Sequence, residues 1–406
     1  MHDEAAAHYV GMVDQTHLGH TFLRREFGEA AVPTVGWQID PFGHSATQAA
    51  LLSAQVGFEA LYFGRIHFKD RARRIAAKDM EFIWRASPSL GEEGQVFTAG
   101  VFHSGNYGPP VGYCFDSACA DDPMMEGGGT GSGGEDGNVR ERVDGFVRAV
   151  EELGRHTAGS DVMLQMGGDF GFEEAEAWFL NLDRLLDAVN LDRRVEAFYS
   201  TPANYTLAKH RSGLDWSVKE DDFFPYADCK VRVWVGIRVG VRVGVRDCYW
   251  TGYFTSRPGL KRLERVTSAY LQSARQLVAL VGTGGVGQGE DGSRLRKLRA
   301  ESSLAMLERA QALVQHHDGV SGTSKQHVAS DYAKRLDVGR VAAERIVNKA
   351  LAILAHAHNE QVRLGAGAGA GAGAEISPML IPIPPTYPEY HQCRLANVSI
   401  CEVTQE

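Results

Sequence analysis

Two aspartates stand where a catalytic carboxylate would be expected. Asp40 follows the apolar run "TVGWQI" and precedes Pro41, which pushes the residue before it towards extended geometry. Asp169 follows the apolar run "DVMLQM" and the pair Gly167 and Gly168, which permit a tight turn or the close approach of a ligand. Two carboxylates at strand ends of one sheet are the minimum set for hydrolysing a glycosidic bond. From the residues alone, an Asp-Pro turn and a cap on the following helix remain alternative explanations.

A histidine pair supplies a candidate metal ligand. His316 and His317 precede Asp318 in "QHHD", where two long predicted helices meet. Adjacent residues are roughly 100° apart on a helix, so we do not expect both histidines to serve one site from a straight helix. A favourable histidine at a helix C-terminus is the alternative. Thr323 and Gln326 fit a capping box that starts the next helix.

Three further stretches carry polar or aromatic residues with two interpretations each. Arg65 ends the apolar run "LYFG" and could bind a substrate oxygen or form a salt bridge. Tyr107, in "SGNYGPP", could stack on a sugar ring or anchor its loop. Asp221 and Asp222, in "EDDFF", are more typical of a solvated turn than of a site.

The elements that must position these residues alternate between strands and helices. The hydrophobic periodicity predicts strands at 34–39, 59–66, 161–168 and 194–200, and helices at 4–27, 46–56, 71–87, 139–156 and 173–190. This alternation indicates parallel βαβ units in a barrel or an open sheet. Three long amphipathic helices follow, at 260–282, 294–317 and 325–363, and predict a helix bundle.

Composition excludes some classes of function. The chain of 406 residues has a formal net charge of -9, which argues against general nucleic-acid binding. It has no apolar run of about 18 residues, so we expect no membrane span. The N-terminal residues lack the pattern of a signal peptide, whereas sequons at Asn204 and Asn397 weakly favour a secretory route.

Three segments are of low complexity: 126–138, 229–248 and 365–374. The first is typical of a flexible loop and the last of a linker. The segment 229–248 repeats Val, Arg and Gly between Cys229 and Cys248, and is either a basic hairpin or non-coding sequence translated in error.

Taken together, seven stretches resemble the lysosomal or vacuolar α-mannosidases of glycoside hydrolase family 38. The matching stretches are "HDEAAAHYVGMVDQTHLG", "IDPFGHS", "GFEALYFGRI", "MEFIWRAS", "DDFFPYAD", "WTGYFTSRP" and "QHHDGVSGTSKQHVASDYAKRL". The resemblance runs nearly end to end outside the low-complexity segments. It implies a seven-stranded parallel β/α barrel-like catalytic domain at 1–257, a three-helix domain at 258–362, and a linker with the start of a C-terminal region at 363–406.

The resemblance also implies residue roles in a retaining, zinc-dependent α-mannosidase acting on terminal mannose of N-glycans. Asp40 matches the nucleophile and a zinc ligand, Asp169 the acid/base, and His317 a second zinc ligand. The positions that line the sugar pocket are Arg65, Tyr107 and Asp318. Disulfides Cys114–Cys119 and Cys393–Cys401 and a lysosomal or vacuolar location follow from the same resemblance.

The chain also departs from the family pattern. The family's first strand carries a His-x-Asp motif whose two residues bind zinc, and "MHDEAAAHY" matches the stretch after that motif. We therefore expect the first strand and the β-rich C-terminal region to be missing, which leaves Asp40 and His317 as zinc ligands where a catalytic zinc needs about three. The resulting alternative is a catalytically inactive, vestigial mannose-binding protein.

Overall fold

The computed structural model describes residues 1–100, 107–117, 119, 121–125, 137–231, 246–283 and 303–367. The chain divides into two compact units. The sheet unit comprises Met1–Ala5 and Phe22–Phe254, and the helical unit comprises Ala6–Thr21 and Thr255–Glu406. Helix α1 (Tyr9–Phe27) contributes residues to both.

A mostly parallel sheet forms the centre of the sheet unit. Its strands are β1 (Val35–Gln38), β2 (Ala60–Phe63), β3 (Glu81–Arg85), β4 (Gln95–Gly100) and β5 (Val218–Lys219), in the order β1-β2-β4-β3-β5. Neighbouring strands are parallel except for β3 and β4, which are antiparallel. The α/β class is therefore confirmed, but the described part of the sheet has five strands rather than seven and is not wholly parallel. Closure into a barrel stays a prediction.

Short helices connect the strands and help to bury the sheet. Between β1 and β2 lie α2 (Ala46–Ala50) and a π-helical turn (Leu51–Gln55), which confirms the helix predicted at 46–56. Helix α3 (Phe68–Ala77) follows β2, and 3₁₀ turns occupy Glu29–Ala31, Gly91–Gly94 and Thr251–Phe254. The core on one face of the sheet includes Phe63, Phe82, Trp84 and Phe223. Burying each such side chain stabilises the fold by about 1.5–3 kcal/mol.

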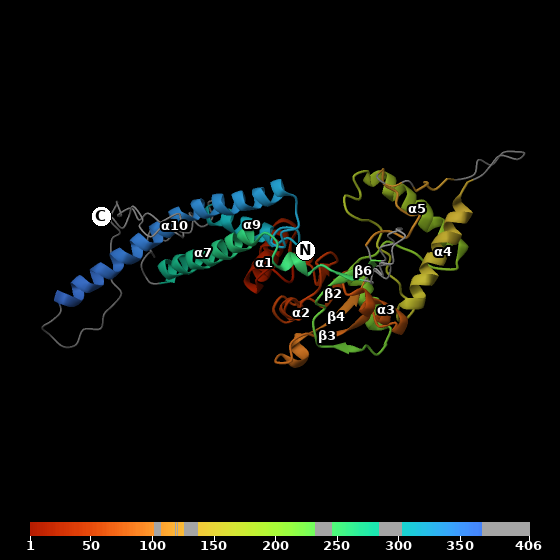
Figure 1. The fold of residues 1–406 in the computed structure, drawn as a ribbon, viewed down its shortest axis with the longest axis horizontal. Helices are drawn as coiled ribbons and strands as arrows, with labels where there is room; N and C mark the ends of the chain where they lie inside the picture. Colours follow the sequence, from red (N-terminus) through yellow and green to blue (C-terminus); the bar gives the residue numbers. More distant parts are fainter. Residues whose placement is uncertain are drawn as a thin grey trace, which may run out of the picture. The chain divides into compact units, whose positions relative to one another are not determined.

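The sheet unit also contains a helix pair. Its members are α4 (Val139–His156) and α5 (Ala175–Asp192), both labelled in Figure 1. They pack through one buried cluster that includes Phe146, Val147, Trp178 and Leu185. Helix α6 (Pro202–Arg211) begins with a Thr201 side-chain cap and a proline in its first turn. The predicted helices at 139–156 and 173–190 are thus confirmed.

Two predicted strands are wrong. Segments 161–168 and 194–200 are described, and neither forms a strand. Alternate residues of each, Leu164 and Met166 and likewise Val195 and Ala197, pack at the edge of the α4–α5 cluster. The alternation in the sequence therefore reflects side-chain burial, and without a hydrogen-bonded neighbour it produces no strand ladder.

Two predicted helices have different boundaries. The helix predicted at 4–27 begins at Tyr9, because the Glu4 carboxylate is engaged by residues near β1. The helix predicted at 71–87 ends at Ala77, where Lys78 adopts a left-handed conformation, and the remainder forms β3. The apolar residues in the second half of the 71–87 segment therefore belong to a buried strand and not to one face of a helix.

The helical unit is built on three long helices, α7 (Pro258–Thr283), α9 (Ser303–Val314) and α10 (Gln326–Gly367) (Figure 1). They share a buried cluster: Leu271, Ala274 and Val278 from α7, Leu304 and Leu307 from α9, and Ala343, Ile346 and Val347 from α10. Within this unit Met12 of α1 packs with Val320, and Asp14 pairs with Arg275.

The ends of the segment 229–248 take part in a small antiparallel pair. Strands β6 (Ala227–Val231) and β7 (Arg246–Tyr249) pair with each other, as the hairpin interpretation expects, and the middle of the segment lies outside the described residues. Residues 126–136 and the predicted linker at 368–374 also lie outside them. Among the described helices, none is both long and apolar enough to cross a membrane.

Candidate active site

The parallel pairing of β1 and β2 brings Asp40 and Arg65 to the same level of the sheet. Gln38 is the last residue of β1 and is in register with Phe63, the last residue of β2. Asp40 and Arg65 each follow two residues later. Both side chains therefore stand at the carboxyl edge of the sheet, as the sequence predicted for Asp40.

Arg65 holds the Asp40 carboxylate. The guanidinium Nε donates to Asp40 Oδ1 at 2.5 Å and to the Asp40 carbonyl oxygen at 3.1 Å, and a second guanidinium nitrogen pairs with Oδ1. The two side chains are only 16% and 15% exposed, so water screens the pair weakly. Burial by itself would lower the pKa of Arg65. The Tyr226 hydroxyl and the Asp40 charge raise it by more than burial lowers it, so the net shift is upward. Arg65 is therefore a permanent cation beside Asp40.

Aromatic rings surround the Arg65 guanidinium. Its carbon lies 5.4–6.0 Å from the ring centroids of Phe42, Tyr107, Tyr226 and Trp250. Each ring presents a partly negative face to the cation, which restricts where the guanidinium can move. The result is an aromatic wall around the Asp40–Arg65 pair.

Tyr107 links this pair to Asp169. Its hydroxyl donates to both carboxylate oxygens of Asp169, at 2.9 Å each, while its ring lies against Arg65. Asp40, Arg65, Tyr107 and Asp169 thus form one continuous series of contacts. Asp169 is exposed, and Asp40 is largely buried.

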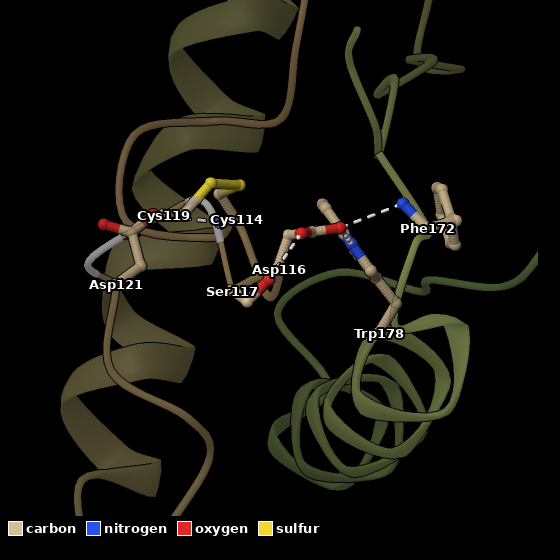
Figure 2. The surroundings of a disulfide bond; sticks show 7 residues. All are labelled: Cys114, Asp116, Ser117, Cys119, Asp121, Phe172 and Trp178. Carbon is tan, nitrogen blue, oxygen red and sulfur yellow. Dashed lines mark hydrogen bonds between the residues drawn. A yellow bond between two sulfur atoms is a disulfide. The ribbon is translucent and has the colours of Figure 1, made fainter. Parts of the chain in front are cut away.

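The loop that carries Asp169 is fastened behind it. Gly167 has a φ of 152°, and a Cβ there would lie 2.9 Å from the Phe172 ring, so the predicted need for glycine holds at Gly167. Three residues beyond Asp169, the Phe172 amide donates to Asp116 at 2.9 Å (Figure 2). The same buried carboxylate accepts from the Trp178 indole at 2.7 Å.

A disulfide fixes the segment that presents Asp116. Cys114 and Cys119 are bonded, which confirms the pairing implied by the resemblance, and Asp116 lies between them (Figure 2). The Cys114 amide also donates to Asp121 at 2.9 Å. Cys393 and Cys401 lie outside the described residues. Sequence reasoning missed Asp116, although an aspartate inside a short Cys-to-Cys loop was a usable signal.

The remaining predicted residues lie in the helical unit. Helix α9 ends at Val314, so His316 and His317 stand in a turn and not on a straight helix. Their ring centroids are 4.2 Å apart, and the possible ligand atoms of His316, His317 and Asp318 all lie within 4.8 Å of one another. The premise of a straight helix is therefore wrong, and the sequence argument against both histidines serving one site does not apply to this turn. Thr323 donates to Asp318 at 2.6 Å, and α10 begins at Gln326.

The His316 imidazole, whose Nε2 lies 3.7 Å from Asp318 Oδ2, and the hydrogen bond from Thr323 stabilise the Asp318 carboxylate against the effect of burial. They lower its pKa to about 2. His317 is 5% exposed and His316 is partly exposed. Two imidazoles and an ionised carboxylate are donors that suit zinc.

Comparison with known proteins decides the family. The family model for the "Glycosyl hydrolases family 38 N-terminal domain" matches residues 1–229, and that for the "Alpha mannosidase middle domain" matches residues 248–354. The chain belongs to glycosyl hydrolase family 38. The sequence resemblance is confirmed.

Relatives and solved structures agree with this family. A probable alpha-mannosidase of Arabidopsis thaliana is 45% identical over 99% of this chain and 33% of its own length. The lysosomal alpha-mannosidase of Homo sapiens is 41% identical over 87% of this chain and 32% of its own length. The crystal structure of an alpha-mannosidase from Enterococcus faecalis V583 covers 88% of this chain and 33% of that chain, with a TM-score of 0.56 and 12% identity, which supports the fold. The family 38 chain described here spans about a third of the length of these relatives.

Proposed function

We propose that this chain carries catalytic residues of a retaining α-mannosidase, with Asp40 as the nucleophile and Asp169 as the acid/base. The observation that supports this most is the contact series from Asp40 through Arg65 and Tyr107 to Asp169. A retaining glycosidase needs two carboxyl groups about 5 Å apart on either side of the scissile bond. The series connects two carboxylates through side chains that can also bind sugar hydroxyls.

In this mechanism Asp40 attacks the anomeric carbon and forms a covalent glycosyl-enzyme. Asp169 donates a proton to the leaving oxygen, then takes one from the water that releases the sugar. Arg65 orients the Asp40 carboxylate before the attack. Tyr107 keeps its proton, because burial and the Asp169 hydrogen bond raise its pKa, and so it donates to Asp169. The aromatic wall around Arg65 excludes water from the side of the nucleophile.

Zinc belongs to this proposal as a cofactor. We propose Asp40 of the sheet unit and His317 of the helical unit as zinc ligands, and Asp318 as a residue that would bind a sugar hydroxyl. The cluster of imidazole and carboxylate atoms at residues 316–318 fits such an ion in its donor chemistry. When bound, zinc supplies a template for sugar hydroxyls that favours ring distortion.

The substrate class follows from the same residues and relatives. We propose terminal α-mannose of N-glycans as the substrate and the lysosome or vacuole as the location, because lysosomal alpha-mannosidases of Homo sapiens and Cavia porcellus are among the relatives. The exposed sequon residue Asn204, at the start of α6, is consistent with a secretory route.

The decisive experiment measures hydrolysis of a chromogenic α-mannoside with and without added zinc. We expect Asp40→Asn to abolish turnover and a slow fluorinated mannoside to label the peptide containing Asp40. Asp169→Ala should lose most turnover of poor leaving groups and retain more with activated ones. Exposed Asp215 provides a control, Asp215→Asn, that should not change the rate. Mannose binding without turnover would reject the catalytic proposal in favour of a mannose-binding protein.

A further inference from the structure

A buried carboxylate and histidine lie behind the Asp40–Arg65 pair. Glu4 and His44 have side-chain exposures of only 1% and 2%, and Glu4 Oε1 lies 3.0 Å from His44 Nδ1. The other ring nitrogen, His44 Nε2, accepts from the Arg65 backbone N–H at 3.2 Å. His44 therefore lies between Glu4 and the residue that holds Asp40.

The hydrogen-bond partners determine the tautomer of His44. The Glu4 carboxylate accepts from the Gln38 amide at 3.0 Å and from the Ser45 backbone N–H at 2.7 Å, and its Oε1 lies 3.0 Å from His44 Nδ1. Glu4 therefore acts as an acceptor towards His44. Because His44 Nε2 accepts from Arg65, the proton lies on Nδ1 and the ring is neutral.

We infer that the Glu4–His44 pair is a positioning device for the nucleophile, and this inference rests on the proposed function of Asp40. His44 belongs to the loop after β1, and Arg65 to the loop after β2, so their hydrogen bond sets how these two loops lie relative to each other. Arg65 is then held at both ends, by His44 at its backbone and by Asp40 and Tyr226 at its guanidinium. Glu4 keeps His44 in the one tautomer that can accept from Arg65.

A purely structural role would not need this tautomer. The His44 ring also packs on Phe63 at a centroid distance of 5.3 Å, and its carbonyl accepts from the Phe223 amide at 2.9 Å. A leucine at position 44 retains the backbone bond and much of the packing, but it offers no acceptor to Arg65. A glutamine retains a donor and an acceptor on one planar group. Comparing His44→Leu with His44→Gln therefore separates packing from positioning.

The first test is steady-state kinetics on the full chain with a chromogenic α-mannoside. We expect His44→Leu to lower kcat by about 10–100-fold with KM within about twofold, as second-sphere partners commonly do. His44→Gln should restore most of kcat. Glu4→Gln should lower kcat as His44→Leu does, because the new amide N–H faces groups that themselves donate to Glu4 in the parent chain. The control is Glu81→Gln, which removes an equally buried carboxylate paired with Lys209 in the same unit and should lower stability without lowering kcat.

The second test needs no turnover. Selective ¹⁵N labelling of histidine should show, for His44, a protonated Nδ1 and an unprotonated Nε2 in the parent chain, and averaged signals in Glu4→Gln. A double-mutant cycle of Asp40→Asn and Arg65→Met, measured by denaturant unfolding, gives the coupling between these two residues. This coupling, expressed as a ratio of unfolding equilibrium constants, should be about fivefold smaller in the His44→Leu background.

The two tests distinguish the two proposals. If the parent chain is inactive, the proposed function fails, and the coupling measurement alone decides whether His44 positions Arg65. If the parent chain is active and His44→Leu is equally active, or if Glu81→Gln lowers kcat as much, the positioning inference is overturned. An Nε2-protonated His44 would overturn it as well.

Discussion

The hydroxyl of Tyr107 lies 2.9 Å from each carboxylate oxygen of Asp169, although 62 residues separate the two in sequence. Burial raises the pKa of the Tyr107 phenol, and the bond to Asp169 raises it again. Tyr107 therefore keeps its proton and donates a hydrogen bond to the carboxylate of Asp169, which is exposed. This contact links Asp169 to the tyrosine ring that lies against the Arg65 guanidinium.

Replacing Tyr107 with phenylalanine tests this contact. Tyr107→Phe keeps the ring over Arg65 but removes the donor, so Asp169 loses its orientation. We expect kcat for an α-mannoside to fall by about 10²-fold, a size typical of losing one positioned donor in an active site. The melting temperature should change little, since Asp169 is exposed and can be solvated.

The matched control is Tyr199→Phe. Tyr199 makes the same type of bond, to Asp183 at 2.7 Å, on an exposed part of the sheet unit. This variant should keep the parental rate. Equal losses of rate in the two variants would show that the effect is unrelated to Asp169.

The sequence predicted the positions of Asp40 and Arg65 well for a physical reason. Each follows a short, strongly apolar strand, and the carboxyl ends of neighbouring parallel strands meet at one edge of a sheet. The contact of Tyr107 with Asp169 was not predictable in the same way. It depends on where two long loops meet, and hydrophobic periodicity contains no information on loop geometry.

Burial without pairing explains the strands that the sequence placed wrongly. Leu164 and Met166 alternate as in a strand, but their backbone finds no ladder partner in the described part of the chain. Glu4 and His44 escaped prediction because each looks like an ordinary polar residue. Only the fold brings residues 40 positions apart into one hydrogen bond.

The Asp40–Arg65 pair should be coupled in stability. Arg65→Met leaves Asp40 largely buried without its cation, and we expect a loss of about 3 kcal/mol in the free energy of unfolding. Adding Asp40→Asn should recover part of this loss, giving a coupling energy of about 1–3 kcal/mol. Denaturant titrations of the parent, the two single variants and the double variant measure it. Strictly additive effects would mean that the ion pair does not form in solution.

Asp318 should make stability depend on acidity. Its pKa is lowered to about 2 from an ordinary 3.8, mainly by the neighbouring His316 imidazole. A carboxyl whose folded pKa is depressed stabilises the fold above its unfolded pKa, and this contribution disappears as the pH falls from about 4 to about 2. Because the side chain is 42% exposed, we expect only about 1 kcal/mol after solvent screening.

Asp318→Asn measures this contribution. The variant should be less stable than the parent at pH 6 and equally stable near pH 2, if both are still folded enough for a denaturant titration. His316→Gln in the parent should reduce the same difference, since it removes the strongest partner. A difference in the free energy of unfolding between parent and variant that does not change with pH would contradict the assignment to the carboxyl group.

Gly43 should be required in the loop that follows Asp40. Its φ is 101°, and a Cβ would lie 2.6 Å from the Phe224 ring and 2.9 Å from the Phe223 carbonyl oxygen. Gly43→Ala should therefore cost about 2–4 kcal/mol, from backbone strain together with the clash. Gly57→Ala provides the comparison, because Gly57 has a φ of 84° but open space around it, and should cost about 1 kcal/mol. Thermal unfolding of both variants checks the difference. Equal decreases in melting temperature would mean that the loop containing Gly43 moves to accept the methyl group.

The Cys114–Cys119 disulfide should stabilise the loop behind Asp169. Its short loop carries Asp116, which accepts from the Phe172 amide and the Trp178 indole. Replacing both cysteines with serine should lower the free energy of unfolding by about 2 kcal/mol, the value that chain entropy gives for a loop of this size.

Because Asp116 would then be less firmly held, the near-ultraviolet signal of Trp178 should weaken before the chain unfolds, and kcat should fall by a few-fold with KM nearly unchanged. Asp116→Asn in the oxidised chain should reproduce the change at Trp178 while leaving the disulfide intact. If the serine variant lost stability but kept both the Trp178 signal and kcat, the disulfide would act on the unfolded chain alone and not on the loop that carries the acid/base.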